Sequence, residues 1–353
     1  MRLEQLETPA LILDMDIFDA NQERMMKYID DLGVTLRPHY KSNKCIAIVH
    51  EQLKKGAKGV TCAKLSEAQD LIEAGVEDVL IANQITEPEK IARVASLAKC
   101  CKLGVVVDQS QNIRDLEAAA SLQNSTIYVL AEYEIGMKRC GVQTKEELLT
   151  LANEINACEH LVFEGIQAYA GHLSHETDAE KREVESNKIE ERLWEARNYL
   201  VGNGIQVNEV SGSSTGTIAN RKKGTPYTEI QAGSYVFMDV AYNKLNLEFK
   251  NSLFILTTVI SKGNNQTITD AGRKSASVDQ ENPVFYGYED VAVNCSEEHA
   301  KVSNEYVDKP LGEKLKLIPG HCCTCMNQNK YLYMVRDGKV IDKVPITSHG
   351  KSR

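Results

Sequence analysis

Residues 59–83, GVTCAKLSEAQDLIEAGVEDVLIAN, contain one complete unit of the pattern that decides the fold. A short apolar run at 59–63 is followed by an amphipathic segment at 64–75 that ends in glycine, and a second apolar run follows at 78–83. Short apolar runs with β-branched residues are typical of buried strands, whereas helical periodicity closed by glycine is typical of a helix. The stretch therefore predicts a strand, a helix and a second, parallel strand.

The same unit recurs from about Gly33 to Val236, where apolar runs rich in Val, Ile and Tyr alternate with helical segments such as 144–157. Eight candidate strands can be counted in this region: TLRPHY (35–40), GVTCA (59–63), DVLIAN (78–83), KLGVVVD (102–108), IYVLAEY (127–133), EGIQAYAG (164–171), VNEVSG (207–212) and EIQAGSYVF (229–237). Eight parallel strands close a (β/α)8 barrel, which commonly takes about 250 residues. We therefore predict an α/β protein with such a barrel over residues 14–236.

The rest of the chain predicts a second, all-β domain. Strand-like runs separated by turn signals lie at 253–261, 266–272, 284–290, 314–323 and 331–346. The last run contains Arg-Asp-Gly between two apolar halves, which is typical of a tight hairpin turn. The opening TPALILDMD (8–16) is also strand-like and precedes the first barrel unit, so we expect it to pair with this second domain. We assign residues 1–13 and 237–353 to a compact antiparallel β domain.

Composition excludes several classes of protein. Of the 353 residues, 42% are hydrophobic and 26% charged, as is typical of a globular protein, and the net charge of −9 argues against a nucleic-acid partner. No apolar run approaches the roughly 20 residues of a membrane span, and the N-terminus lacks the order of a signal peptide. Most of the ten cysteines lie in apolar runs, where a reduced thiol acts as a small hydrophobe. We expect a cytoplasmic protein without a disulfide framework or a membrane partner.

Lys41 is the first candidate for chemistry. The first predicted barrel strand ends in RPHYKSNK, which puts Lys41 at the carboxyl rim, where barrels carry their active sites. A lysine taken at random is usually a solvated surface residue. An amine must be unprotonated to attack an aldehyde, and neighbouring cations, here His39 and Lys44, favour that form.

A loop rich in glycine and hydroxyl groups follows the seventh predicted strand. Its sequence, GSSTGT, comprises Gly212, Ser213, Ser214, Thr215, Gly216 and Thr217. Such a loop offers backbone N–H and hydroxyl groups to a phosphate, and we expect the N-terminus of a following helix to add a favourable dipole. Loops of this composition also serve as plain connections between strands and helices. Together with Lys41 on the same barrel, the loop is typical of a pyridoxal-phosphate (PLP) site, with the phosphate at one end and the amine at the other.

Two further rim segments carry candidate ligands. AEYEIGMKRCGV contains Arg139, which would hydrogen-bond the phenolic oxygen of PLP, and EGIQAYAGHLSH contains Tyr169, which would cover a ring face. A surface salt bridge and a core tyrosine are equally compatible with these residue types. His172 and His175 follow at the same rim, and two histidines beside a cofactor indicate an acid, base or ligand role for at least one of them.

The segment IPGHCCTC (318–325) is the second strong signal. On an extended strand alternate side chains share a face, so His321 and Cys323 would point to one side and Cys322 to the other. An imidazole and a thiolate form half of a zinc site and favour Zn over Mg or Ca. Cys325 would join them if the strand continues. A cluster of reduced cysteines in a β core explains the same spacing, so both alternatives stay open.

Seven motifs together resemble the D-threonine aldolases and their relatives, the D-serine and 3-hydroxyaspartate dehydratases. They are RPHYKSNK, EIGMKRCGV, GIQAYAGHLSH, VSGSSTGT, TEIQAGSYVFMD, DAGRKSAS and IPGHCC, and they follow in the expected order along nearly the whole chain. Enzymes of this family share the alanine-racemase-like fold, called fold type III of PLP enzymes. The resemblance implies a PLP-binding barrel, a β domain with metal ligands, a small D-amino acid as substrate, and a homodimer.

The resemblance also assigns roles to single residues of the barrel rim. Lys41, in a PH-x-K motif with His39, would bind the cofactor covalently. Arg139 would reach the oxygen of PLP, and Tyr169 would lie beside the ring. The glycine-rich loop 212–217 would take the phosphate.

The motif TEIQAGSYVFMD adds three residues to the implied cofactor site. Gly233 and Tyr235 would lie near the phosphate. Gln231 occupies the position from which alanine racemases supply an arginine to the pyridine nitrogen. A neutral partner there would leave the nitrogen unprotonated and make the ring a weaker electron sink.

The family's metal pair matches His321 and Cys323, and its candidate base near the metal matches His175. Aldolases of this family usually carry Asp at the second ligand position, which suits Mn or Mg, whereas the dehydratases carry Cys and use Zn. Around the ligands, however, the motifs resemble the aldolases. We therefore expect Zn, with Mn or Mg as alternatives. We favour retro-aldol cleavage of D-β-hydroxy amino acids to glycine and an aldehyde over β-elimination to a 2-oxo acid and ammonia.

Two other functions fit the same fold. An amino-acid racemase would use the PLP site without a metal and would keep its activity after chelation. A non-catalytic PLP carrier would need neither a β domain nor a pair of ligands, so the second domain argues against it. The roles of Cys322 and Cys325 and the preferred group at Cβ stay open.

Overall fold

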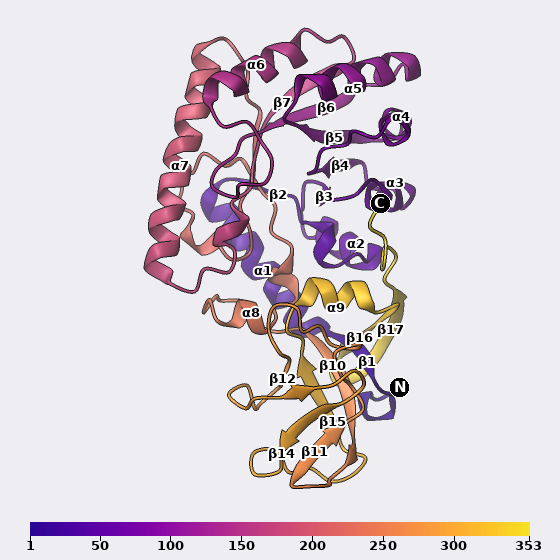
Figure 1. Ribbon diagram of the computed structural model, residues 1–353. Helices are drawn as coiled ribbons and strands as arrows, with labels where there is room; N and C mark the ends of the chain where they lie inside the picture. Colours follow the sequence, from indigo (N-terminus) through magenta and orange to yellow (C-terminus); the bar gives the residue numbers. More distant parts are fainter. The chain divides into compact units, whose positions relative to one another are not determined.

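The computed structural model describes residues 1–353, which form two compact units (Figure 1). The barrel unit comprises Met26–Lys41, Ile48–Gly233 and Lys351–Arg353. The β unit comprises Met1–Met25, Ser42–Ala47 and Ser234–Gly350. None of the helices is both long enough and apolar enough to span a membrane.

The barrel unit is built on eight strands that are all parallel. They are β2 (Thr35–Leu36), β3 (Val60–Cys62), β4 (Asp78–Ile81), β5 (Lys102–Val107), β6 (Ile127–Glu132), β7 (Leu161–Ala168), β8 (Glu209–Gly212) and β9 (Glu229–Ile230), in the order β2-β9-β8-β7-β6-β5-β4-β3. The ends of this order meet, because the N–H of Lys58 donates to the carbonyl of Leu36 at 2.8 Å and that of Thr61 to Pro38 at 2.9 Å. Each predicted strand segment overlaps one of these strands, so the predicted (β/α)8 barrel is confirmed.

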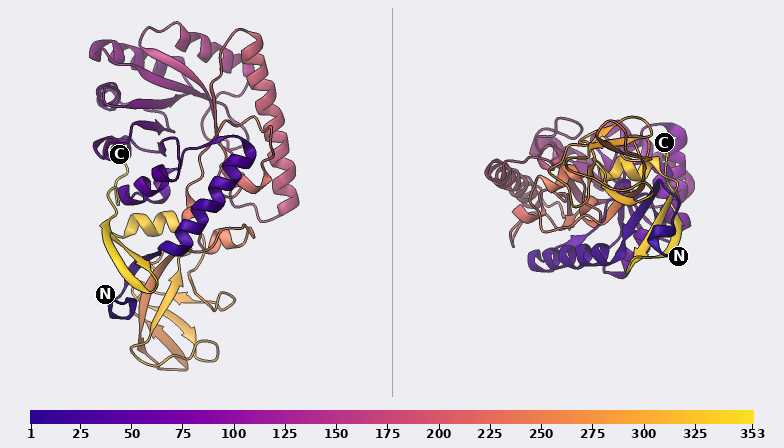
Figure 2. Two further views of the ribbon diagram at one scale, coloured as in Figure 1. Left: turned by 180° about the vertical axis from the view of Figure 1, so that it is seen from behind. Right: turned by 90° about the horizontal axis from the view of Figure 1, so that it is seen from below.

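Helices connect consecutive strands and lie along the outer side of the sheet (Figures 1 and 2). They are α2 (Ile46–Lys54), α3 (Leu65–Glu73), α4 (Pro88–Leu97), α5 (Ser110–Gln123), α6 (Lys145–Asn156) and α7 (Ala179–Gly202), whereas α1 (Met15–Leu32) precedes the first barrel strand. Local sequence sets their ends. α6 begins at a capping box in which Thr144 accepts from the N–H of Glu147 at 3.2 Å and the Glu147 carboxylate accepts from the N–H of Thr144 at 3.0 Å.

The β unit holds a nine-stranded sheet with the order β13-β14-β11-β10-β1-β16-β17, to which β15 adds beside β10 and β12 beside β15. Its strands are β1 (Ala10–Asp14), β10 (Leu253–Ser261), β11 (Gln266–Thr269), β12 (Val284–Phe285), β13 (Asn294–Cys295), β14 (Ala300–Ser303), β15 (Lys314–Ile318), β16 (Tyr331–Arg336) and β17 (Lys339–Pro345). β1 pairs antiparallel with β10 and parallel with β16, which confirms that the opening strand joins the β domain.

Two details of the β unit show how sequence sets its geometry. β16 and β17 form the predicted hairpin, and Asp337 and Gly338 at its turn have φ values of 48° and 68°. Positive φ at both central residues gives the turn a twist that matches the strands. The sheet packs around a core of Leu6, Ala10, Ile12, Phe254, Leu256, Ile318 and Val335.

The prediction of an extended strand through His321 and Cys323 is wrong. β15 ends at Ile318, and Cys322–Gln328 form helix α9, with His321 at its N-cap. The Asp239 carboxylate explains the change of structure, because its Oδ2 accepts from the N–H of Cys322 at 2.8 Å, at the first turn of α9. Alternation along a strand therefore does not decide which way these side chains point.

Candidate functional site

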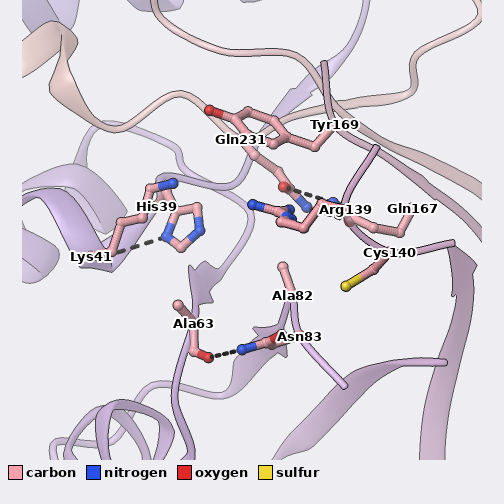
Figure 3. Close-up of a pocket in the computed structure, with 10 residues that line it drawn as sticks. All are labelled: His39, Lys41, Ala63, Ala82, Asn83, Arg139, Cys140, Gln167, Tyr169 and Gln231. Carbon is pink, nitrogen blue, oxygen red and sulfur yellow. Dashed lines mark hydrogen bonds between the residues drawn. The ribbon is translucent and has the colours of Figure 1, made fainter. Parts of the chain in front are cut away.

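A pocket of about 200 Å³ lies at the carboxyl edge of the barrel (Figure 3). Its lining comes from the ends of six strands or the loops that follow them: His39, Lys41, Ala63, Ala82, Asn83, Arg139, Cys140, Gln167, Tyr169 and Gln231. Among the residues predicted from the sequence, the pocket brings together His39, Lys41, Arg139, Tyr169 and Gln231. The carboxyl edge is the face on which barrels carry active sites.

Tyr169 forms a wall of this pocket between two cations. The Nζ of Lys41, in the short turn η2 (Tyr40–Ser42), lies 5.3 Å from the centre of the Tyr169 ring. The guanidinium of Arg139 lies 5.8 Å from the same centre. Arg139 is also 3.9 Å from the carboxylate of Glu132, at the end of β6. The pocket is therefore positively charged next to an aromatic face.

His39 is a neutral imidazole in this surrounding. Burial lowers the pKa of His39 well below its ordinary value, and the charges of Lys41 and Arg139 lower it further. Its Nδ1 accepts from the backbone N–H of Lys41 at 3.4 Å, so the ring hydrogen belongs on Nε2. The expectation that His39 adds a positive charge beside Lys41 is therefore wrong, and Arg139 supplies that charge instead.

The glycine-rich loop after β8 forms a buried cluster of hydroxyl groups. Ser213, Ser214, Thr215 and Thr217 are all at most 5% exposed. Thr217 Oγ1 lies 3.1 Å from Ser213 Oγ and also 3.1 Å from the hydroxyl and the backbone nitrogen of Ser214. Hydroxyl and backbone N–H groups gathered in one turn are suited to bind an oxyanion.

Close packing explains the two glycines of the loop. A Cβ on Gly212 would lie 1.9 Å from the carbonyl oxygen of Ala168, and one on Gly216 would lie 2.0 Å from that of Ser174. Ser174 Oγ donates to Ser214 Oγ at 2.9 Å and lies 3.3 Å from the hydroxyl of Tyr169. The hydroxyl cluster is thus connected to the pocket through Ser174.

The helix expected after this loop is missing. Only a three-residue 3-10 helix, η4 (Ile218–Asn220), follows Thr217. A turn of this length has no appreciable dipole, so the prediction of dipole support for a phosphate is wrong. Ser213 instead adopts a left-handed conformation, with φ of 61°, at the point where the loop leaves β8.

Gln231 is held in a reciprocal amide pair with Gln167. Nε2 of Gln231 donates to Oε1 of Gln167 at 2.8 Å, and Nε2 of Gln167 donates to Oε1 of Gln231 at 3.2 Å (Figure 3). Gln231 also donates to Ser211 Oγ at 2.8 Å. Sequence reasoning missed Gln167, although it lies two positions before Tyr169 in the predicted strand 164–171, which was a signal for it.

The β unit contains the predicted His321–Cys323 pair. Burial lowers the pKa of His321, but the hydrogen bonds and negative charges of Cys323 and Asp279 raise it overall to about 9. The pKa of Cys323 lies well below its ordinary value because its sulfur accepts hydrogen bonds from Cys322, His321 and Ser42, although burial opposes this shift. Each of the two side chains therefore stabilises the charged form of the other.

Asp279, which sequence reasoning missed, orients His321. Its Oδ2 lies 2.8 Å from Nδ1 of His321 and accepts from the hydroxyl of Thr324 at 2.9 Å. Ser277 holds the backbone of His321 from both sides, accepting from its N–H at 2.9 Å and donating to its carbonyl at 2.5 Å. A carboxylate on one nitrogen of a histidine leaves the other nitrogen available as a metal ligand. Asp279 follows the DAGRKSAS motif by two positions, which was the available signal.

Cys325 lies apart from this pair. Burial raises the pKa of Cys325 to about 12, and its Sγ lies 3.6 Å from the carbonyl oxygen of Ser275. No group of three or more His, Cys, Asp or Glu side chains in the chain has the geometry to hold a metal ion. The pair thus offers two protein ligands rather than a complete protein cage.

Four other predicted residues do not line the pocket. His172 and His175 lie at or just after the short turn η3 (Gly171–Leu173) that follows β7. Gly233 is the last residue of its barrel segment, and Tyr235, in η5 (Ser234–Val236), is buried with its ring centre 5.9 Å from that of Phe249. The predicted roles of His175, Gly233 and Tyr235 stay predictions.

Comparison with known proteins agrees with this architecture. Residues 13–241 match the alanine racemase N-terminal domain, and residues 252–335 match a serine dehydratase domain. The chain is 36% identical to 3-hydroxy-D-aspartate aldolase of Paracoccus denitrificans (strain Pd 1222), over 98% of this chain and 93% of that protein. It is 35% identical to D-threonine aldolase of an Arthrobacter species, over 99% and 95% of the two chains.

A solved structure of a D-threonine aldolase is also similar to this chain over nearly its whole length. The crystal structure of D-threonine aldolase from Filomicrobium marinum superposes with a TM-score of 0.95 at 33% identity, over 99% of this chain and 98% of that one. By contrast, D-threo-3-hydroxyaspartate dehydratase of a Delftia species is 27% identical, over 95% and 96% of the chains. With a matching domain over most of its length and relatives above 30% identity over nearly all of it, the chain belongs to the family of alanine-racemase-like enzymes that includes the D-threonine and 3-hydroxy-D-aspartate aldolases.

Proposed function

We propose that this chain is a PLP- and metal-dependent lyase that cleaves the Cα–Cβ bond of D-β-hydroxy amino acids, giving glycine and an aldehyde. The observation that carries the proposal is the rim pocket, in which Lys41 lies beside Tyr169 and Arg139. Family membership adds support, because the relatives above 30% identity are named aldolases.

The pocket and its surroundings fit the cofactor. A cavity of roughly 150 Å³ is enough to hold benzene, so about 200 Å³ accommodates a six-membered ring. Lys41 would hold the cofactor's aldehyde carbon, Tyr169 would cover the ring, and the hydroxyl cluster at 213–217 would hold the phosphate. When bound, PLP supplies an electron sink for the carbanion that forms when a bond to Cα breaks.

The charges of the side chains around the pocket favour binding of an anionic ligand. Lys41 and Arg139 bring positive charge, which attracts both a phosphate and an amino-acid carboxylate. Because His39 is neutral and accepts from the backbone of Lys41, it holds the turn that carries the amine without adding charge.

The donor set of the second candidate site fits zinc. The imidazole of His321 and the thiolate of Cys323 are preferred zinc ligands, and the thiolate disfavours Mg and Mn. Two protein ligands leave positions for water and for a substrate hydroxyl, and the ion would polarise that hydroxyl as a Lewis acid. Ser42, which follows Lys41 in the sequence, belongs to the β unit and hydrogen-bonds the sulfur of Cys323. We propose that the amine and the ligand pair serve one reaction.

Two residues would move protons in the reaction. For aldol cleavage, the imidazole of His175 would take the proton of the β-hydroxyl group of the substrate. For the competing elimination, the amine of Lys41 would take the α-proton instead. The β-elimination of a dehydratase is the second candidate function, and the specific observation that favours it is the cysteine rather than aspartate at position 323.

Product analysis distinguishes the two reactions. The purified protein, loaded with PLP and zinc, is incubated with D-threonine and with D-serine, and a Lys54→Ala variant serves as a control because Lys54 lies outside the pocket. We expect glycine and acetaldehyde from D-threonine, and loss of turnover in Lys41→Ala but not in Lys54→Ala. Formation of 2-oxobutyrate or pyruvate with ammonia would assign the chain to the dehydratases instead. Interconversion of D- and L-amino acids that survives chelation would assign it to the racemases.

The oligomeric state and the location in the cell belong to the same proposal. The resemblance to fold type III enzymes implies a homodimer in which each subunit helps to complete the other's site. We also propose that the protein acts in the cytoplasm, on a small amino acid.

A further inference from the structure

One serine hydroxyl connects the pocket residue Gln231 to buried ion pairs of the barrel. Ser211 Oγ donates to Oε1 of Glu229 at 2.5 Å and accepts from Nε2 of Gln231 at 2.8 Å. Glu229 and Gln231 are two residues apart on an extended segment, so their side chains project to the same side. Ser211 in β8 is the register partner of Glu229 in β9, which places its hydroxyl between the two side chains.

Glu229 is fixed as a hydrogen-bond acceptor by two cations. Its side chain is 1% exposed, and its Oε2 lies 2.8 Å from Nε of Arg37 and 3.4 Å from Nζ of Lys58. Burial alone lowers the pKa of Arg37, but the carboxylates of Glu229 and Asp78 raise it overall, so the guanidinium stays charged. Beside a permanent cation the carboxylate is ionised, and an ionised carboxylate has no hydrogen to donate.

Because Glu229 only accepts, it fixes which group donates in each hydrogen bond from Ser211 to Gln231 and Gln167. Ser211 has one hydroxyl hydrogen, which Glu229 takes, so its oxygen has to accept the next bond. Only the nitrogen end of the Gln231 amide can donate that bond. The second hydrogen of the same nitrogen goes to Oε1 of Gln167, so both amide hydrogens of Gln231 are used. Gln167 uses one hydrogen toward Gln231 and keeps the other.

We propose that Glu229, acting through Ser211, is a positioning residue that locks the orientation of the Gln231–Gln167 amide pair. In this orientation Gln231 can only accept a hydrogen bond from a ligand in the pocket, through its Oε1. The donor of the pair is the remaining N–H of Gln167. Without the link to Glu229, both amides could turn over together and keep their mutual hydrogen bonds, and Gln231 would then have a hydrogen free for the ligand.

The fixed orientation of Gln231 decides which hydrogen bond it can make with the pyridine nitrogen of PLP; this step rests on the proposed function. If the pyridine nitrogen of PLP contacts Gln231, it has to bring its own hydrogen, because the only free valence of Gln231 is a lone pair on Oε1. The nitrogen would then be protonated. From the sequence, a neutral glutamine at position 231 indicates an unprotonated ring nitrogen, because the glutamine would then donate a hydrogen bond to it. The orientation in the structure indicates the opposite.

The orientation itself can be tested in the protein without any cofactor. Neutron diffraction from a deuterium-exchanged crystal distinguishes the nitrogen from the oxygen of a glutamine amide and locates the deuterons. We expect the nitrogen of Gln231 to face Ser211 and the deuteron of Ser211 to face Glu229. The oxygen of Gln231 facing Ser211 would overturn the proposal whatever the enzyme catalyses.

The effect on the ligand is tested with PLP labelled with ¹⁵N in its ring. In the wild-type protein we expect a ring-nitrogen resonance in the protonated range. Ser211→Ala removes the link while leaving Glu229 paired with Arg37, so the resonance should move toward the unprotonated range. Ser211→Thr keeps a hydroxyl and should restore the wild-type position.

A matched control separates the lock from a general weakening of the barrel. Asp78→Asn removes another partner of Arg37, which Asp78 binds at 2.7 and 3.1 Å, but Asp78 makes no contact with Ser211. We expect Asp78→Asn to lower thermal stability and leave the resonance unchanged. An unprotonated nitrogen in the wild type, or the same resonance in Ser211→Ala as in the wild type, would overturn the proposal for the ligand. Absence of bound PLP would refute the proposed function, and the neutron experiment would still decide the lock.

Discussion

His39 shows how burial decides what a pocket residue can do. On sequence alone it is a second cation next to a lysine, because histidine titrates near neutral pH. In the structure it is buried between Lys41 and Arg139, and both burial and these charges keep it neutral. Its part in the pocket is therefore that of a hydrogen-bond acceptor for the backbone of Lys41, which holds the turn that carries the amine.

Cys323 is the residue that decides which metal the pair prefers. A thiolate favours zinc, whereas a carboxylate in its place favours harder ions such as Mn or Mg. We predict that Cys323→Asp lowers the zinc content relative to manganese when the apoprotein is loaded from an equimolar mixture and analysed by elemental analysis. The reason is that aspartate keeps the negative charge but replaces a soft donor with a hard one.

Cys325→Ala provides the control for this exchange. Cys325 is buried nearby in the same helix, but its thiol lies against the carbonyl of Ser275 rather than against His321. Its removal should leave the preference for zinc unchanged. Equal zinc content in Cys323→Asp and the wild type would show that position 323 does not bind the metal.

At the scale of elements, α9 is held in place by a buried carboxylate. Asp239 accepts from the N–H of Cys322 at the start of α9 and from the N–H of Tyr242 in α8 (Val240–Asn243), each at 2.8 Å. Burial raises the pKa of Asp239 to about 6, although these two N–H bonds lower it. One carboxylate thus joins the first turns of two helices, at the cost of being desolvated.

This arrangement predicts a pH dependence of stability. The folded-state pKa of Asp239 is raised from 3.8 to about 6. Its contribution to the free energy of unfolding is therefore fully present below about pH 4 and is lost as the pH rises through 6. The wild type should therefore gain stability relative to Asp239→Asn as the pH falls from 7 to 4. One pKa unit corresponds to about 1.4 kcal/mol, so the gain is on the order of 3 kcal/mol.

Urea unfolding of both proteins at several pH values measures this difference. Taking the difference between the two proteins cancels the titration of all other groups that the substitution leaves alone. A difference that stays constant, or one that shrinks toward pH 4, would contradict the account of Asp239.

The sequence predicts the elements of the barrel well, because each strand is a short apolar run between glycine or polar turns. It failed at residues 321–325, where the decisive contact comes from Asp239, more than 80 positions away in the chain. It also missed Asp279 and Gln167, since a carboxylate or an amide shows its partner only once the chain has folded. Lys41, Arg139 and Tyr169 were found because strand ends predict the rim of a barrel.

At the scale of the whole molecule, each of the two units carries a different part of the proposed chemistry. The barrel unit holds the pocket with Lys41, and the β unit holds His321 and Cys323. The proposed reaction needs both, because the cofactor stabilises the carbanion and the metal polarises the hydroxyl group. Truncation to either unit should therefore abolish turnover.

The expected homodimer also belongs to this scale. We predict that light scattering after size-exclusion chromatography gives twice the mass of one chain at micromolar concentration. The prediction derives from the resemblance to fold type III enzymes, in which a neighbouring subunit helps to build the site. A single-chain mass together with full activity would contradict it.

The central claim, that Lys41 carries the cofactor of a lyase, is tested most directly by locating the cofactor on the chain. Borohydride reduction of the PLP-loaded protein makes the bond between lysine and cofactor permanent, and mass spectrometry of the digested protein identifies the modified residue. We predict a single pyridoxyl group, on Lys41. Attachment to another lysine, or no attachment to the folded protein, would contradict the account.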